Sequence, residues 1–289
     1  MTSTNTRQVA LVVGASRGIG RQVAIDLAKE GYAVVVAAKS VTSPADLAKL
    51  SPFPPDPKSS QSTITTVARE ITEAGGEATA IPTYARLDVL VYNSGAIWWA
   101  PVARTPMKRF QLMQRVNVEG LYGTVQEALP HMKRQEGQQG RIVVVCPPIY
   151  SRFFRGKTAY AMGKVGMSVL VKGLAMDFKR EGLDGMGVAI ESAATEQFTR
   201  KDPSYANDLR KPTIFSDAIL AMIKAPASVI NGELELDEDF LRKQAGVTDF
   251  SKYAVVPGTS PRRIMPAELP DLTVKEQDDE GMRTDSSKL

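Results

Sequence analysis

Tyr160 and Lys164 are the two side chains whose spacing most directly indicates chemistry. They are four residues apart in a segment with helical periodicity, so both would lie on one helix face. A free tyrosine titrates near ~10 and is a poor base at neutral pH, but a neighbouring ammonium favours the phenolate and lowers that pKa. Such a pair can exchange a proton with a substrate oxygen. The alternative is a helix that carries an ordinary tyrosine and an ordinary lysine.

A glycine-rich turn near the N-terminus has the spacing of a phosphate-binding loop. It reads Gly14-Ala15-Ser16-Arg17-Gly18-Ile19-Gly20, between an apolar run and a helical pattern. Gly14 allows the tight turn, while Gly18 and Gly20 let a pyrophosphate approach the backbone and the N-terminus of the helix. A plain turn that contains glycines is the alternative, but the position between a strand and a helix favours dinucleotide binding.

The end of the second apolar run indicates the type of dinucleotide. An NAD-selective site usually has Asp or Glu roughly 20 residues after the loop. The corresponding segment here is Ala37-Ala38-Lys39-Ser40, which contains no carboxylate. Arg17 and Lys39 instead supply two cations near the ribose 2′ position, where a phosphate would bind them. The sequence therefore predicts NADP(H), unless both side chains are only solvated surface cations.

The elements that must position these residues alternate along the chain. Apolar runs predict strands at 9–13, 33–38, 77–82, 87–93 and 141–146, with weaker strands near 186–190 and 232–236. Helical patterns follow the glycine loop and cover about 64–74, 106–134 and 158–181. Continuous apolar strands that alternate with helices are typical of an α/β fold, with helices on both faces of a parallel sheet. Residues 42–62 contain five prolines and are predicted to form a loop.

Composition and charge exclude several classes of protein. Lys and Arg total 36 and Asp and Glu total 32, and this small excess, without a basic block, argues against a nucleic-acid binder. One cysteine, Cys146, and one histidine, His131, exclude a disulfide framework and a Cys-rich or His-rich metal site. No apolar run approaches ~18 residues, so we expect no membrane span. The polar start of the chain lacks a signal-peptide pattern, so we expect an intracellular protein.

These motifs resemble those of the short-chain dehydrogenase/reductase family over roughly residues 8–245. The glycine loop has the family's spacing, and Tyr160-Ala161-Met162-Gly163-Lys164 matches its Tyr-x-x-x-Lys signature. Asn93-Ser94-Gly95 is similar to the end of its Asn-Asn-Ala-Gly segment, and Asn117 matches its helix asparagine. Residues 37–39, 146–148 and 253–258 are similar to the hydroxysteroid dehydrogenase-like subgroup. Some members of that subgroup carry a sterol-carrier domain, which we expect to be absent here because the chain is too short.

The resemblance implies a Rossmann-type doubly wound sheet over 8–250 and an NADP(H)-dependent enzyme that interconverts a carbonyl and an alcohol on a lipid-like substrate. Tyr160 would be the general acid/base, Lys164 would also bond the nicotinamide ribose, and Asn117 would hold a water in the proton relay. Asn93 and Gly95 would join the glycine loop in the cofactor site, and oxidised nicotinamide would further lower the Tyr160 pKa. The resemblance also implies a homo-oligomer formed through the helices at 106–134 and 158–181.

Two departures from the family pattern concern residues that the family uses at its active site. Pro147 stands thirteen residues before Tyr160, where the family places a serine, so the role of orienting the substrate oxygen falls to Ser151, to another group or to none. Cys146 beside it is predicted to be a buried thiol at a strand end rather than a nucleophile. The segment 187–195 lacks the family's Pro-Gly turn, so no residue is assigned to the nicotinamide carboxamide.

A third departure concerns the connection between the strands at 77–82 and 87–93. The expected strand order 3-2-1-4-5-6 separates them by roughly 14 Å sideways, and the chain must also return along a strand of roughly 17 Å. Five Cα steps reach only about 17 Å. We therefore expect no crossover helix at this point. Either 77–82 is not the edge strand, or the chain is a shortened variant of a longer protein.

These departures keep a second function open, namely a non-catalytic or weakly active dinucleotide-binding protein. Tyr160, Lys164 and Asn117 favour the enzyme, whereas Pro147 and the missing segments favour this alternative. Trp98 and Trp99 are predicted either to line a pocket for a lipid-like substrate or to pack in the core.

The C-terminal tripeptide Ser287-Lys288-Leu289 reads as a peroxisomal import address that a receptor recognises. Residues 257–289 are polar and charged, and we expect them to form a mostly disordered tail that leaves the tripeptide accessible. The sequence therefore predicts a peroxisomal protein, or a cytoplasmic one if the match is a coincidence.

Overall fold

A sheet of seven parallel strands forms the centre of the computed structural model, which describes residues 7–80, 86–132, 140–177, 183–189, 203–261, 263 and 265–272. The strand order is β3-β2-β1-β4-β5-β6-β7, and every neighbouring pair is parallel. The strands are β1 Val9–Val13, β2 Ala33–Ala37, β3 Glu77–Thr79, β4 Val89–Tyr92, β5 Gly140–Val145, β6 Leu183–Ala189 and β7 Leu234–Leu236. This order confirms the predicted Rossmann-type sheet.

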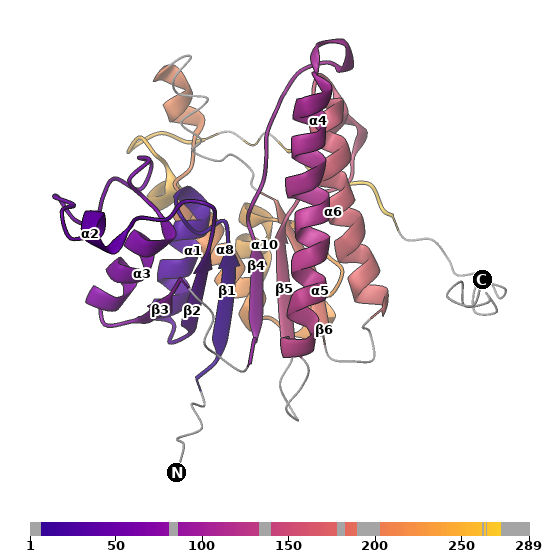
Figure 1. Cartoon of the computed structure of the whole chain (residues 1–289). Coiled ribbons are helices and arrows are strands. Elements are labelled where there is room, and N and C mark those ends of the chain that lie inside the picture. The colour runs from indigo at the N-terminus through magenta and orange to yellow at the C-terminus, as the bar shows by residue number, and fades with distance from the viewer. Residues whose placement is uncertain are drawn as a thin grey trace, which may run out of the picture.

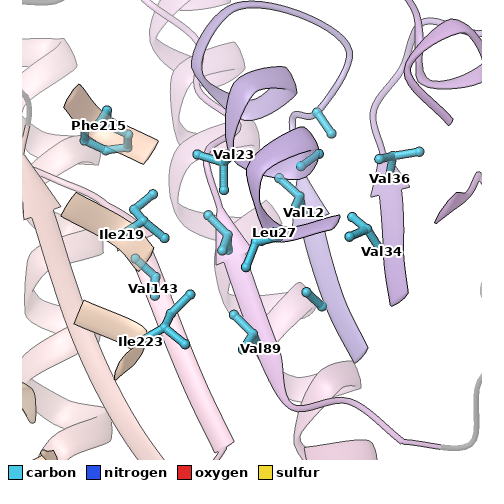
Figure 2. Packing of buried hydrophobic residues seen from close by; sticks show 14 of the residues in the cluster. Val12, Val23, Leu27, Val34, Val36, Val89, Val143, Phe215, Ile219 and Ile223 are labelled. Carbon is cyan, nitrogen blue, oxygen red and sulfur yellow. The ribbon is translucent and has the colours of Figure 1, made fainter. Parts of the chain in front are cut away.

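Helices lie on opposite faces of the sheet (Figure 1), and alternate side chains of the strands pack against them. Helices α1 (Gly18–Lys29), α3 (Ile64–Glu73) and α8 (Pro212–Lys224) cover one face, and Figure 2 shows Val12, Val36 and Val143 in this layer. Helices α5 (Gly120–Met132) and α6 (Thr158–Asp177) cover Leu90 and Val144 on the other. The described chain also contains α2 Pro44–Leu47, α4 Met107–Met113, α9 Ala227–Ile230 and α10 Asp237–Gln244. Strands buried on both faces explain the continuous apolar runs.

The helix expected over 106–134 is interrupted in the structure. Helix α4 ends at Met113, a wider π-helical turn covers Gln114–Glu119, and α5 begins at Gly120. Single π-helical turns inside α-helices occur frequently at functional sites. The buried residue of this turn is Asn117, so the irregularity coincides with a predicted site residue.

The connection from β3 to β4 corrects the expected strand bounds. β3 ends at Thr79 and pairs with β2 at the sheet edge, and β4 begins at Val89. The alternative that this strand lies away from the edge is therefore wrong. Ten Cα steps separate Thr79 from Val89 and reach about 35 Å, which is enough for the crossing. Residues 80 and 86–88 of this connection are described and none is helical, while 81–85 lie outside the described residues.

A cavity of about 780 Å³ borders β1 and β2 on the face opposite α1. Val9, Leu11 and Val35 line it from the sheet, and Gly123 and Ala128 line it from α5. Parallel sheets of this class normally have helices over both faces. The described residues of the β3–β4 connection form no helix, and the cavity lies on the sheet face that such a helix would cover.

The described end of the chain returns to the body of the protein. Arg263 forms an ion pair with Asp239 of α10 at 2.6 Å, and the Tyr150 hydroxyl donates to Met265 Sδ at 3.0 Å. Residues 273–289, which include the expected import tripeptide, lie outside the described residues. Within the described ranges, none of the helices combines the length and the apolar character needed to cross a bilayer.

Candidate active site

The glycine loop joins the carboxyl end of β1 to the start of α1 in a tight turn with close backbone contacts. The Gly14 N–H donates to Ala37 O at 2.7 Å, which ties the loop to the end of β2. Gly14 has φ +88° and Gly18 has φ +55°, a region that favours glycine. A Cβ added to Gly20 would lie 2.2 Å from Gly14 O and 2.8 Å from Asn93 Nδ2. Two of the predicted glycines are thus needed for backbone conformation, and the third for close packing.

Arg17 and Lys39 both lie exposed at the carboxyl ends of β1 and β2. The Arg17 guanidinium donates to Ser40 Oγ at 3.4 Å, so it reaches the residue next to Lys39. The two residues that the sequence assigns to a 2′-phosphate thus follow adjacent strands, and Arg17 contacts the neighbour of Lys39. Ser16 is buried within the loop, and Ile19 packs against the core below it.

The proline-rich segment 42–62 packs against the glycine loop, which its composition alone did not indicate. Ser62 Oγ donates to Ser16 O at 2.6 Å, and the Gly18 N–H is directed at Pro57 O at 3.4 Å. A helix N-terminus offers unpaired N–H groups to a phosphate. Here the Gly18 N–H already has a long contact with Pro57 O. A phosphate that bound to the Gly18 N–H would have to displace Pro57 O.

Asn117 joins the turn after β4 to the helical layer. Its side chain is fully buried, accepts from Ala96 N at 2.8 Å and donates to Ala96 O at 3.1 Å. The Asn93 side chain donates to Gly14 O at 3.4 Å, so the same turn also contacts the glycine loop. A Cβ on Gly163 of α6 would lie 3.4 Å from Asn117. The described contacts make Asn117 a residue that positions the Asn93-Ser94-Gly95 turn against α6.

Lys164 lies buried on α6 and donates from Nζ to Val145 O at the end of β5. Burial lowers the pKa of Lys164 to about 8. Burial also raises the pKa of Tyr160 to about 12, which is opposite in direction to the expected lowering. The physical reason is that Tyr160 loses solvent, while the Lys164 ammonium is directed to a carbonyl oxygen. In this structure Tyr160 holds its proton at neutral pH, and the raised pKa makes its phenol a weaker acid than that of a free tyrosine.

The positions beside the missing serine are occupied by groups of low reactivity. Pro147 O accepts a hydrogen bond from Ser168 Oγ at 2.6 Å. Cys146 is buried directly after β5, as expected, and burial raises its pKa to about 11. Ser151, one of the alternatives for the role of the family's serine, is exposed at the start of the 3₁₀ turn Ser151–Phe154, in which Phe153 is buried. The segment 190–202, which contains most of the region without a Pro-Gly turn, lies outside the described residues.

Aromatic rings surround Tyr160. The ring centroids of Trp99 and Phe153 each lie 6.1 Å from the Tyr160 centroid. Trp99 is 46% exposed, whereas the Nε1 atom of Trp98 is buried and the Arg109 guanidinium lies 4.7 Å from the Trp98 ring. Trp98 is therefore partly buried beside Arg109, and Trp99 lies beside the candidate catalytic tyrosine. The sequence analysis missed Phe153, which precedes the helix and has no motif of its own.

A family model described as short chain dehydrogenase matches residues 8–205. The chain therefore belongs to the short-chain dehydrogenase family, a family of oxidoreductases that bind nicotinamide dinucleotides. Among its relatives, hydroxysteroid dehydrogenase-like protein 2 of Danio rerio is 33% identical over 270 residues, and the Homo sapiens protein of that name is 32% identical. A crystal structure of a short chain dehydrogenase from Mycobacterium thermoresistibile is 29% identical with a TM-score of 0.74, and the match covers 91% of this chain and 96% of that one.

The chain spans about three fifths of the length of these curated relatives, since the alignments cover 86% of this chain and 60% of each relative. Because 86% of 289 residues is about 249, the 270 aligned positions include about 21 gaps in this chain. The relatives therefore contain residues within the matched region that this chain lacks. This agrees with the short β3–β4 connection.

Proposed function

We propose that the chain is an NADP(H)-dependent oxidoreductase that interconverts a carbonyl and an alcohol on an apolar substrate, with Tyr160 as general acid/base. The observation that carries the proposal is the arrangement of Tyr160. Its ring centroid lies 6.1 Å from the centroids of both Trp99 and Phe153, on the helix that also carries Lys164. The glycine loop, the Asn93 turn and Cys146 follow β1, β4 and β5, so all lie at the carboxyl edge of the sheet, where ligands of such folds bind.

The cofactor, when bound, supplies or accepts the hydride. The chain's own residues handle the proton and the position of the substrate. Tyr160, which is protonated at neutral pH, donates its phenolic proton to the carbonyl oxygen during reduction and recovers a proton afterwards. Asn117 fixes the turn beside the cofactor, and Lys164 would contact the nicotinamide ribose after leaving Val145 O. Steady-state NADPH oxidation with a panel of aldehydes and ketones tests this function.

A non-catalytic dinucleotide-binding protein is the second candidate. Pro147 supplies no side-chain donor, and Pro57 O faces the Gly18 N–H that a phosphate would use. Absence of turnover across the whole panel, together with measurable NADPH binding, would favour this candidate.

NADPH should bind at least about ten-fold more tightly than NADH, because Arg17 and Lys39 can each pair with a 2′-phosphate. Calorimetric titration of both cofactors measures this difference. Lys39→Ala should reduce it, while Lys29→Ala at the far end of α1 provides a charge-matched control. Equal affinities that neither variant changes would contradict the assignment.

We infer that the last three residues direct the chain to peroxisomes, because the sequence ends in Ser287-Lys288-Leu289. A fluorescent protein fused to the N-terminus should give a punctate peroxisomal signal. Deletion of the tripeptide should make the signal diffuse, whereas deletion of three residues within 275–286, with the tripeptide retained, should not. A diffuse signal from the full chain would contradict the prediction.

We also propose that two copies pair through α5 and α6, as the family resemblance implies. Four exposed large hydrophobic side chains described on these helices support this pairing, namely Tyr122, Met162, Val169 and Met176, at 54%, 58%, 59% and 71% exposure. Burial of such side chains stabilises an interface.

A further inference from the structure

The two segments that surround Tyr160 carry positive charge without any negative charge. Residues 93–118 and 146–176 contain no Asp or Glu. They contain nine basic residues, namely Arg104, Lys108, Arg109, Arg115, Arg152, Arg155, Lys157, Lys164 and Lys172. The whole chain has a net charge of only +4, so the rest of the sequence is net negative. A region of the surface with one sign of charge attracts ligands of the opposite sign.

Lys157 is the basic residue that lies in contact with the rings around Tyr160. Its Nζ atom lies 4.4 Å from the Phe153 centroid and 4.9 Å from the Trp99 centroid. Both of these rings also contact the Tyr160 ring. No described ion pair involves Lys157, although twelve other ion pairs are described. Among the described groups, the contacts of its ammonium are with aromatic faces.

The surroundings of Lys157 strengthen its attraction for an anion. Partial burial lowers the pKa of Lys157, which shows that its ammonium has lost part of its hydration. An ion pair gains more when less water must be removed from the cation. Two buried N–H donors of the segment 93–118, Trp98 Nε1 and Gln114 Nε2, have no acceptor among the described residues. The described groups of this region thus include cations and unpaired donors, and its two segments supply no carboxylate.

We propose that Lys157 binds an anionic oxygen group of the substrate, so that the substrate class is an apolar carbonyl compound that carries a carboxylate or a phosphate. This inference rests on the proposed function, because it places the substrate at the same site. The apolar body of the substrate would contact Trp99 and Phe153, and its carbonyl would reach Tyr160.

Intrinsic fluorescence can test the proposal, because Trp98 and Trp99 are the only tryptophans of the chain. The full chain is titrated with octanoate, octyl phosphate and the neutral octanamide, which share an apolar body. Octanoate or octyl phosphate should bind at least about ten-fold more tightly than octanamide, and the tighter of the two identifies the anion. Lys157→Met should remove this preference, and Lys157→Arg should retain it. Lys108→Met, which changes the net charge equally, should leave most of it.

Several outcomes would overturn the proposal. These are equal affinities for the neutral and charged compounds, no fluorescence change with any of them, or an equal loss of preference in Lys108→Met. If Lys157→Met fails to fold by thermal melting, Lys157→Gln serves in its place. The test does not depend on turnover. Tight binding of an anion without any NADPH oxidation would refute the proposed function and leave the anion site standing. Turnover of neutral carbonyl compounds without preference for charged ones would refute the anion site and leave the proposed function standing.

Discussion

Tyr160→Phe should lower kcat/KM for carbonyl reduction by about 10³-fold and leave NADPH affinity nearly unchanged. Phenylalanine keeps the ring that contacts Trp99 and Phe153 but lacks the phenolic proton. The wild-type side chain is protonated through the neutral range, as a free tyrosine is, and can act as the donor, although burial raises its pKa to about 12 and so makes it a weaker acid. NADPH oxidation at saturating cofactor and calorimetric NADPH titration measure the two effects separately.

Tyr150→Phe provides the matched control for this substitution. Tyr150 contacts Phe153 at 6.0 Å between centroids but lies outside the Tyr-x-x-x-Lys pair, so the same loss of a hydroxyl should change kcat/KM little. If Tyr160→Phe retains most of its turnover, another group supplies the proton and the assignment of Tyr160 is wrong.

Gly20→Ala should weaken NADPH binding by at least about 100-fold, because the added methyl group cannot fit without moving the loop. Its position would be 2.2 Å from Gly14 O and 2.8 Å from Asn93 Nδ2, and two of the three nearest atoms belong to the backbone. Relief of these overlaps requires α1 to shift away from β1, which displaces the N–H groups that face the phosphates. Calorimetric titration measures the affinity, and thermal melting shows whether the variant is folded.

Gly123→Ala is the control for the loss of a glycine in a helix. No atom lies within 4 Å of the added Cβ, so this change should stabilise the protein by about 0.5–1 kcal/mol and leave NADPH binding intact. Wild-type affinity in a folded Gly20→Ala variant would show that the dinucleotide does not bind at this loop.

The sequence predicted the sheet well because its signals are local. Runs such as Ala33–Ala37 and Gly140–Val145 are continuous and apolar, as strands buried on both faces require, and glycines with positive φ mark the loop. The predicted end of β3 was wrong. The apolar residues continue past Thr79, but the pairing with β2 stops there. Sequence patterns contain no information about where a neighbouring strand ends.

Only those residues of the candidate site that belong to a sequence motif could be named from the sequence. Tyr160, Lys164 and Asn117 have fixed spacing, and the structure places all three around the start of α6 and the turn after β4. Lys157 and Phe153 were recognised only from contact distances in the structure, although Lys157 stands three residues before Tyr160 at helical spacing. The direction of the Tyr160 pKa shift also depends on burial, which no spacing rule supplies.

Local unfolding should cost least in the half of the sheet that contains β1, β2 and β3. The cavity leaves part of this half without the second helical layer that covers β4 and β5, and β3 contributes only three residues to the edge. Segments with fewer buried contacts open at lower free energy and lose protection from proteases first. A dinucleotide on the glycine loop would bind the closed form of this half alone and so oppose its opening. The supply of cofactor in the cell would then set the lifetime of the protein as well as its activity.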